Sequence, residues 1–156
     1  MIQTNGLLTK ATQSKMEKIV ANQFNVKKFE FENVTSTFYI EKSLFLTDYE
    51  VYKIHSETIL GSAMLGRAPS KTDYFDYLLL FDTQWTLQNV KVVAYREDYG
   101  GEIASSRWLQ QFVGKQPLKD IELEGEIAAI SGATISVKSM TKSVNWVLKH
   151  LNTTYE

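Results

Sequence analysis

The fold is decided by three consecutive segments: ILGSAML at residues 59–65, DYFDYLLLFD at residues 73–82 and QNVKVVAYR at residues 88–96. Each is a short run rich in apolar, aromatic or β-branched residues, which is typical of a strand. Turn-forming stretches separate them at 66–71, which contains Gly66 and Pro69, and at 83–87. Because these connections are short and contain no helical spacer, the sequence predicts an antiparallel meander rather than a parallel sheet.

Segments with helical periodicity surround these strands. Apolar residues recur at steps of three and four in residues 8–24, 102–113 and 136–151, which predicts three amphipathic helices. Gly114 and Pro117 are expected to end the middle helix.

Two further segments, 27–31 and 49–54, mix apolar with charged residues and are predicted to be strands with one exposed face. The order of elements predicts an α+β domain in which an antiparallel sheet is flanked by helices.

Composition restricts the class of protein. The 156 residues, 44% of them hydrophobic, are enough for one core, so residues 1–156 are expected to form a single domain. A net charge of -1 does not indicate the basic surface that nucleic-acid binding requires. The absence of cysteine excludes disulfides and thiolate metal sites. His55 and His150 have no metal-ligand spacing, so no zinc site is expected. Neither a signal peptide nor a membrane-spanning segment is recognised in the sequence.

The sequence EIAAISGATIS at residues 126–136 is the candidate functional motif. It is a loop of small residues that leads into the last predicted helix, where unpaired N–H groups and the positive end of the helix dipole attract anions. Gly132 and Ala133 leave room for a phosphate, and the Thr134 hydroxyl is placed to accept a phosphoryl ester. The alternative is that Ser131, Thr134 or Ser136 only caps the helix.

The motif and its surroundings resemble the FMN-binding domain family, which includes the NqrC and RnfG subunits of bacterial respiratory complexes. Residues 130–136 are similar to that family's flavinylation motif. Residues 89–100 are similar to its strand and Glu-Thr-x-Gly turn, with Glu97 and Gly100 matching, and residues 108–115 to its helix ending in Gln-Phe-x-Gly-Lys. The resemblance is clearest over residues 59–151.

The resemblance implies a flavoprotein that transfers electrons rather than a stand-alone enzyme. FMN is expected to be linked through its phosphate to Thr134 by a separate flavin transferase, with noncovalent FMN as the other possibility. Redox partner proteins at the extracytoplasmic face of a bacterial membrane are implied as well. The cofactor-binding residues expected are Thr134, Ser131, Gly132, Ala133, Ser136, Glu97 and Gly100.

One position departs from the family pattern. The family has aspartate six residues before the modified threonine, and this chain has Ala128 there. Two alternatives therefore stay open: a flavin-free ligand-binding or interaction module of the cell envelope with the same fold, and a small reductase with noncovalent FMN. Tyr99, Trp108 and Phe112 are expected to pack in the core, and the alternative for each is contact with the flavin ring.

Overall fold

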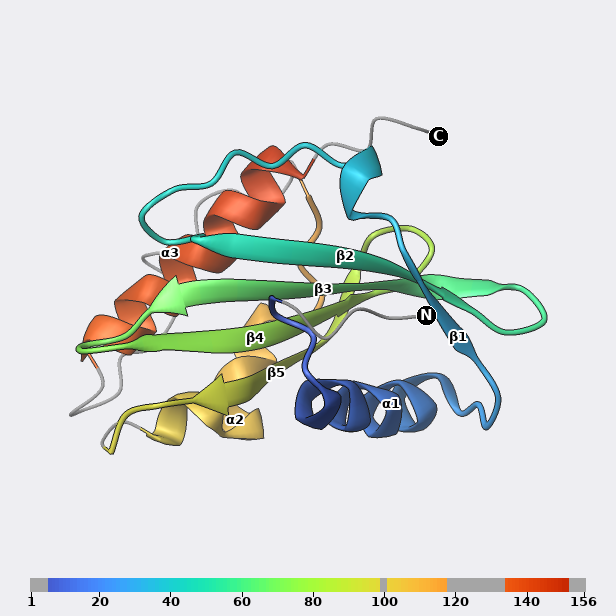
Figure 1. Ribbon diagram of the computed structural model, residues 1–156, viewed down its shortest axis with the longest axis horizontal. Helices are drawn as coiled ribbons and strands as arrows, with labels where there is room; N and C mark the ends of the chain where they lie inside the picture. Colours follow the sequence, from blue (N-terminus) through green and yellow to red (C-terminus); the bar gives the residue numbers. More distant parts are fainter. Residues whose placement is uncertain (1–5, 99–100, 118–133, 152–156) are drawn as a thin grey trace.

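The structure is a computed structural model that describes residues 6–98, 101–117 and 134–151. Within these residues five strands form one sheet in the order β1-β2-β3-β4-β5, and every neighbouring pair is antiparallel (Figure 1). The strands are β1 (Glu30–Asn33), β2 (Asp48–His55), β3 (Ile59–Pro69), β4 (Tyr74–Phe81) and β5 (Leu87–Tyr95). The predicted antiparallel meander of an α+β domain is confirmed.

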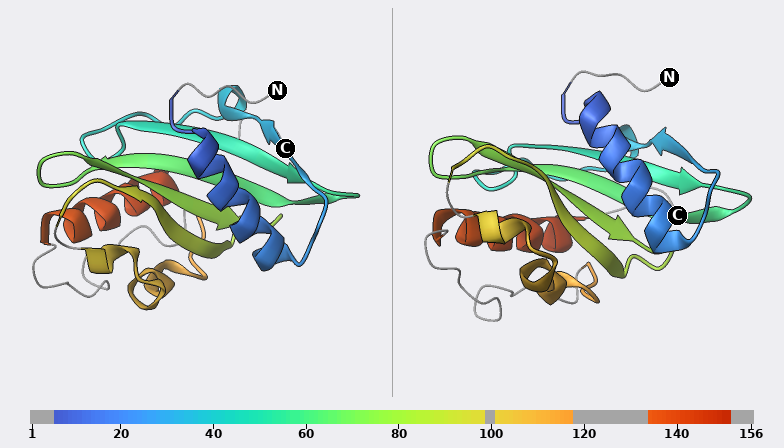
Figure 2. Two further views of the ribbon diagram at one scale, coloured as in Figure 1. Left: turned by 60° about the horizontal axis from the view of Figure 1, so that its bottom comes forward. Right: turned by 90° about the horizontal axis from the view of Figure 1, so that it is seen from below.

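Helices cover both faces of the sheet. Helix α1 (Lys10–Phe24) lies on one face, and α2 (Ser106–Leu109) and α3 (Thr134–His150) lie on the other (Figure 2). Side chains alternate along a strand, so β4 supplies both layers. Its Phe75, Tyr77, Leu79 and Phe81 join the core under α3, whereas Leu78 and Leu80 join the core under α1. This two-sided burial explains the unbroken apolar run from Tyr77 to Phe81 in β4.

Caps at both ends stabilise helix α1, and side chains in its middle bind it to the sheet. The Thr9 hydroxyl caps the helix by accepting from the N–H of Thr12 at 3.1 Å, and Asn25 ends it in a left-handed conformation at φ 54°. Met16 is fully buried against the sheet. The Lys15 ammonium donates to the Val93 carbonyl at 2.6 Å, where the register of the β4–β5 ladder shifts.

Strand β3 is longer than predicted. The sequence predicted a turn from Gly66 to Lys71, but the strand continues to Pro69. At Gly66 the ring of Tyr77 on β4 lies so close that an added Cβ would be 2.4 Å from the ring's Cζ, so this glycine permits cross-strand packing. Pro69 is the last residue of the strand, where the missing N–H is tolerated.

The prediction of one exposed face is correct for β1, although this strand begins at Glu30 and not at the predicted residue 27, and it is wrong for β2. Strand β1 is an edge strand, and the side chains of Glu30–Asn33 are exposed or half-buried. Strand β2 lies between two neighbours, and its side chains join the hydrophobic cores on both faces of the sheet. Val51 therefore packs towards α3, and Tyr52 packs towards α1, each at most 2% exposed.

The helix predicted over residues 102–113 is interrupted. The structure has a 3-10 helix η2 (Gly101–Ala104), the single turn α2 and a 3-10 helix η3 (Gln110–Phe112). Ser105 causes the interruption, because its backbone is extended at ψ 138° and its hydroxyl accepts from the N–H of Trp108 at 3.3 Å, which starts a new helix. The apolar spacing still indicated burial correctly: Trp108 is 7% exposed and Phe112 is 0% exposed.

The sheet has two distinct ends. The β2–β3 turn, residues 56–58, lies at one end, and the β3–β4 turn, residues 70–73, lies at the other (Figure 1). Helix α3 begins at Thr134 near the β3–β4 turn and runs diagonally across its face of the sheet. It buries Met140, Val144, Val147 and Leu148, and the Ser143 hydroxyl lies 2.6 Å from the Tyr77 hydroxyl. None of the helices described is long and apolar enough to cross a bilayer.

Candidate functional site

The candidate site lies where β5 ends and α3 begins. Tyr95 is the last residue of β5, and its hydroxyl lies 3.1 Å from the Ser136 hydroxyl in the first turn of α3. Ser136 is 3% exposed, so this contact is shielded from water. The ring of Tyr95 also packs against Phe75, with 6.2 Å between the ring centroids. The contact with Ser136 joins the start of α3 to the end of the sheet, and the contact with Phe75 holds the Tyr95 ring against β4.

Glu97 joins this region to the β3–β4 turn. Its carboxylate accepts hydrogen bonds from the Ser70 hydroxyl at 2.5 Å, the Thr72 N–H at 2.7 Å, the Thr72 hydroxyl at 2.8 Å and the Asp73 N–H at 3.1 Å. These bonds favour the ionised form, the one from Ser70 most of all, and lower the pKa of Glu97 from 4.5 to about 2. Glu97 is therefore a carboxylate at neutral pH whose oxygens are occupied by the turn.

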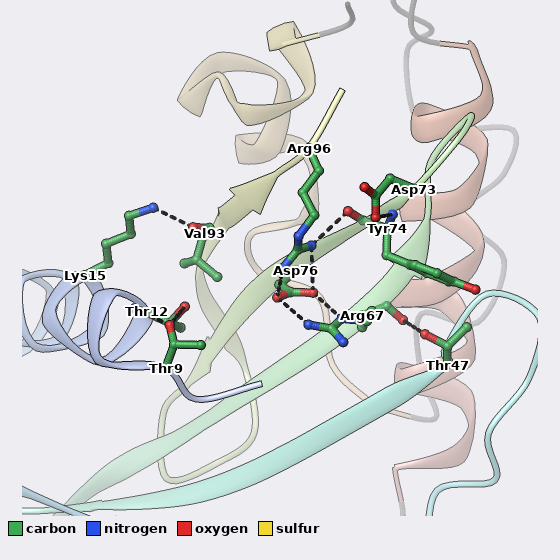
Figure 3. A network of polar contacts seen from close by, with 10 residues as sticks. All are labelled: Thr9, Thr12, Lys15, Thr47, Arg67, Asp73, Tyr74, Asp76, Val93 and Arg96. Atoms are coloured by element: carbon green, nitrogen blue, oxygen red, sulfur yellow. Dashed lines mark hydrogen bonds and ion pairs between the residues drawn. The ribbon is translucent and has the colours of Figure 1, made fainter. Parts of the chain in front are cut away.

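Between these two residues, Arg96 belongs to an ionic cluster on the α1 face of the sheet (Figure 3). Asp76 of β4 is 2% exposed and binds the Nε of Arg67 at 2.7 Å and the Nη2 of Arg96 at 2.9 Å. Arg96 also donates to the Tyr74 carbonyl at 2.9 Å. Burial raises the pKa of Asp76, but the hydrogen bonds and charges of the two arginines outweigh this effect and lower it overall. Asp76 therefore stays ionised inside the protein.

The comparison with protein families identifies the chain. The family model for the FMN-binding domain matches residues 39–149, which include β2 to β5, α2 and nearly all of α3. The chain belongs to the FMN-binding domain family. Its cofactor is FMN. The match starts upstream of residue 59, so β2 and the loop before it are part of the family domain, whereas α1 and β1 precede it.

A solved structure agrees with the fold. The crystal structure of NqrC from Shewanella oneidensis aligns with 91% of this chain and 94% of its own, with a TM-score of 0.61 and 13% sequence identity. At this identity the likeness shows the fold. No curated protein matches the sequence.

The structure describes only part of the predicted cofactor site. Thr134 is the first residue of α3, in agreement with a motif that opens the last helix, and Ser136 lies in the same turn. Glu97 is brought to the same end of the sheet by its bonds to the β3–β4 turn. The other residues predicted for the site lie outside the described residues: Ser131, Gly132, Ala133 and Gly100. Ala128 and Tyr99 also lie outside them.

The described residues suit the phosphate of FMN. Helix α3 is 17 residues long, so its first turn has a full helix dipole and backbone N–H groups without helical acceptors. Its first turn contains no acidic residue that would repel a phosphate, and Lys138 is exposed one turn beyond Thr134. This end of α3 therefore favours an anionic group such as a phosphate.

A hollow elsewhere in the described structure is separate from the candidate site. A hollow of about 860 Å³ is lined by Val26, Lys27, Lys28, Phe29, Glu30, His55, Ser56, Glu57, Thr58 and Leu60. It lies at the opposite end of the sheet and includes none of the predicted site residues. His55 pairs with Glu32 at 2.7 Å, and the residues that the structure describes contain no cluster of metal-ligating side chains.

Sequence reasoning missed the partners that hold this end of the sheet together. The sequence did indicate one of these contacts: Asp76 lies inside an apolar strand, and a buried acid there needs a cationic partner. Which arginines supply the charge depends on the register of β3, β4 and β5. Ser70 and Thr72 carried no signal beyond their position in a predicted turn.

Proposed function

We propose that this chain is an electron-transfer flavoprotein domain that carries FMN as a phosphate ester on Thr134. The observation that supports it most is that Thr134 of the Ser-Gly-Ala-Thr motif stands at the first position of α3 in a chain of the FMN-binding domain family. A hydroxyl at this position is next to the N–H groups and the dipole that stabilise a phosphate.

The protein's own residues hold the cofactor in place. The Thr134 oxygen forms the ester bond to the phosphorus of FMN and loses its proton. The flavin transferase takes FMN from a phosphoanhydride donor, whose P–O–P bond breaks and whose other phosphate-bearing half leaves. Ser131, Gly132 and Ala133 directly precede Thr134 in the sequence, and the contact between Ser136 and Tyr95 fixes the first turn of α3. FMN, when bound, supplies the redox chemistry.

The partners follow from the kind of protein that this chain resembles. The family that the chain resembles in sequence includes subunits of bacterial respiratory complexes, so we propose that the chain exchanges electrons with proteins at the extracytoplasmic membrane face. The protein surface around the flavin then selects the donor and acceptor.

Intact-protein mass spectrometry of denatured protein from cells that express a flavin transferase tests the attachment. Wild type is expected to carry the added mass of FMN less water, and Thr134→Ala is expected to lack it. Thr134→Ser keeps an ester oxygen and is expected to keep some label. Thr58→Ala is the matched control, because it removes an exposed threonine hydroxyl from the β2–β3 turn at the opposite end of the sheet, and it is expected to be labelled like wild type. Flavin on Thr134→Ala would refute the assignment of the site.

Ala128 favours a second candidate, the flavin-free binding module of the cell envelope. If the missing carboxylate prevents modification, wild type stays unlabelled and Ala128→Asp is labelled. An absorption spectrum before and after acid precipitation separates the possibilities: colour in the pellet indicates covalent FMN, colour in the supernatant indicates noncovalent FMN, and no colour indicates the flavin-free module. Equal, complete labelling of wild type and Ala128→Asp would show that residue 128 does not control attachment.

A further inference from the structure

Three consecutive residues at the end of β5 bind three different parts of the protein. Tyr95 contacts Ser136 on α3, Arg96 contacts Asp76 on β4, and Glu97 contacts the β3–β4 turn. They reach different partners because successive side chains of an extended chain point to opposite faces. Tyr95 therefore points to the α3 layer, and Arg96 points to the α1 layer, where Figure 3 shows it above Asp76.

The hydrogen bonds of Arg96 and Glu97 restrict the positions of the segments that they join. Glu97 accepts four hydrogen bonds, two of them from backbone N–H groups of the turn, so its carboxylate determines the path of residues 70–73. Arg96 is held by a buried carboxylate and by the Tyr74 carbonyl. Charge-assisted bonds to a planar guanidinium are strongly directional.

The same segment stands at the site of the cofactor. Ser136, the partner of Tyr95, lies two residues after Thr134, and η2 (Gly101–Ala104) packs against β5 just after the segment. A displacement of residues 95–97 would therefore move the start of α3 relative to the sheet.

We propose that Tyr95, Arg96 and Glu97 form a clamp, the 95–97 clamp, that positions FMN by fixing the first turn of α3 against the β3–β4 turn. This inference rests on the proposed attachment of FMN at Thr134. Glu97 and Tyr95 act through the protein backbone as positioning residues, and the clamp gives the flavin one orientation at this end of the sheet.

Two isosteric variants test the clamp. Tyr95→Phe removes the hydroxyl that meets Ser136 and keeps the ring against Phe75. Glu97→Gln removes the charge and places an amide NH₂ among hydrogen-bond donors. Glu32→Gln is the matched control, because its carboxylate also accepts one side-chain hydrogen bond, from His55, but at the opposite end of the sheet.

Amide hydrogen exchange of the full chain without flavin provides the first measurement. Tyr95→Phe is expected to increase the rate of amide exchange in residues 136–140, and Glu97→Gln is expected to increase it in residues 70–74. The expected increase is about fivefold to tenfold in each case, which corresponds to the loss of one or two hydrogen bonds. Glu32→Gln is expected to leave both segments unchanged. Unchanged exchange in Tyr95→Phe and Glu97→Gln would overturn the clamp.

Fluorescence anisotropy of the flavin-loaded proteins provides the second measurement. Both clamp variants are expected to lower the anisotropy of the flavin relative to wild type, because its anchoring turn moves more freely. Faster exchange with unchanged anisotropy would mean that these residues only brace the fold, which overturns the positioning of FMN. A wild-type chain that takes up no FMN would instead overturn the proposed function, and the exchange data would still decide whether residues 95–97 hold α3.

Discussion

Replacing Asp76 by asparagine should destabilise the protein at neutral pH. The variant keeps the size of the side chain and one acceptor oxygen, which can still meet the Nε of Arg67. The new NH₂ group faces the Nη2 atoms of Arg67 and Arg96, which now lie 3.1 Å and 2.9 Å from the Asp76 carboxylate. Whichever way the amide turns, at least one charge-assisted hydrogen bond is replaced by a contact between donors, and both arginines lose the negative charge beside them.

The size of the effect follows from these contacts and from the exposure of the arginines. Each charge-assisted hydrogen bond contributes about 1.5 to 3 kcal/mol, and this contribution sets an upper limit on the stability lost with each bond. The side chains of Arg67 and Arg96 are 30% and 36% exposed, so water recovers part of the loss. We expect the free energy of unfolding to fall by about 2 to 3 kcal/mol.

Urea unfolding at pH 7 measures this change, and urea is preferred to guanidinium because it does not screen ion pairs. With a slope of about 2 kcal/mol per molar, the midpoint of Asp76→Asn should fall by about 1 to 1.5 M. Asp98→Asn is the control, because Asp98 is exposed, and it should change the free energy by less than about 0.5 kcal/mol. A change in Asp76→Asn no larger than in this control would refute the reasoning.

Two other substitutions address the turn and the core. Because the pKa of Glu97 falls from 4.5 to about 2 on folding, its contribution to stability is complete above pH 4.5 and disappears as the pH falls towards 2. The stability difference between wild type and Glu97→Gln should therefore narrow over this range in urea titrations, and a constant difference would contradict the prediction. Gly66→Ala puts a Cβ 2.4 Å from the Tyr77 ring and should lower the free energy of unfolding by about 1 to 3 kcal/mol. Ala68→Gly is the control for backbone flexibility, because it leaves that ring in place. An unchanged thermal midpoint for Gly66→Ala would show that the ring moves freely.

The strands and α3 were predictable because their signals are local. The apolar run of β4 and the alternation in β5 depend only on neighbouring residues, and α3 begins close to the predicted position. The segment 102–113 was mispredicted because Ser105 has a spacing that suits a helix interior, yet its hydroxyl caps a new turn instead. The apolar periodicity on both sides of Ser105 correctly indicated which side chains are buried, but it did not indicate whether the helix is continuous.

The contacts of the candidate site were less accessible to sequence reasoning. Glu97 was recognised through the family pattern, but its bonds to the β3–β4 turn arise only when β3 extends past Gly66 and places Ser70 beside the end of β5. The burial of β2 on both faces depends likewise on residues distant in the sequence, which no local pattern in β2 reveals. Tertiary placement decides both features.

The opposite ends of the sheet offer a practical means of orienting the molecule. Glu57 is exposed in the β2–β3 turn, at the end away from Thr134, and the chain contains no cysteine. A Glu57→Cys variant therefore has one thiol for attachment to a gold electrode. Immobilised through it, every molecule would present the start of α3 to the solution, so that voltammetry would record electron exchange with soluble partners at a uniformly oriented protein layer.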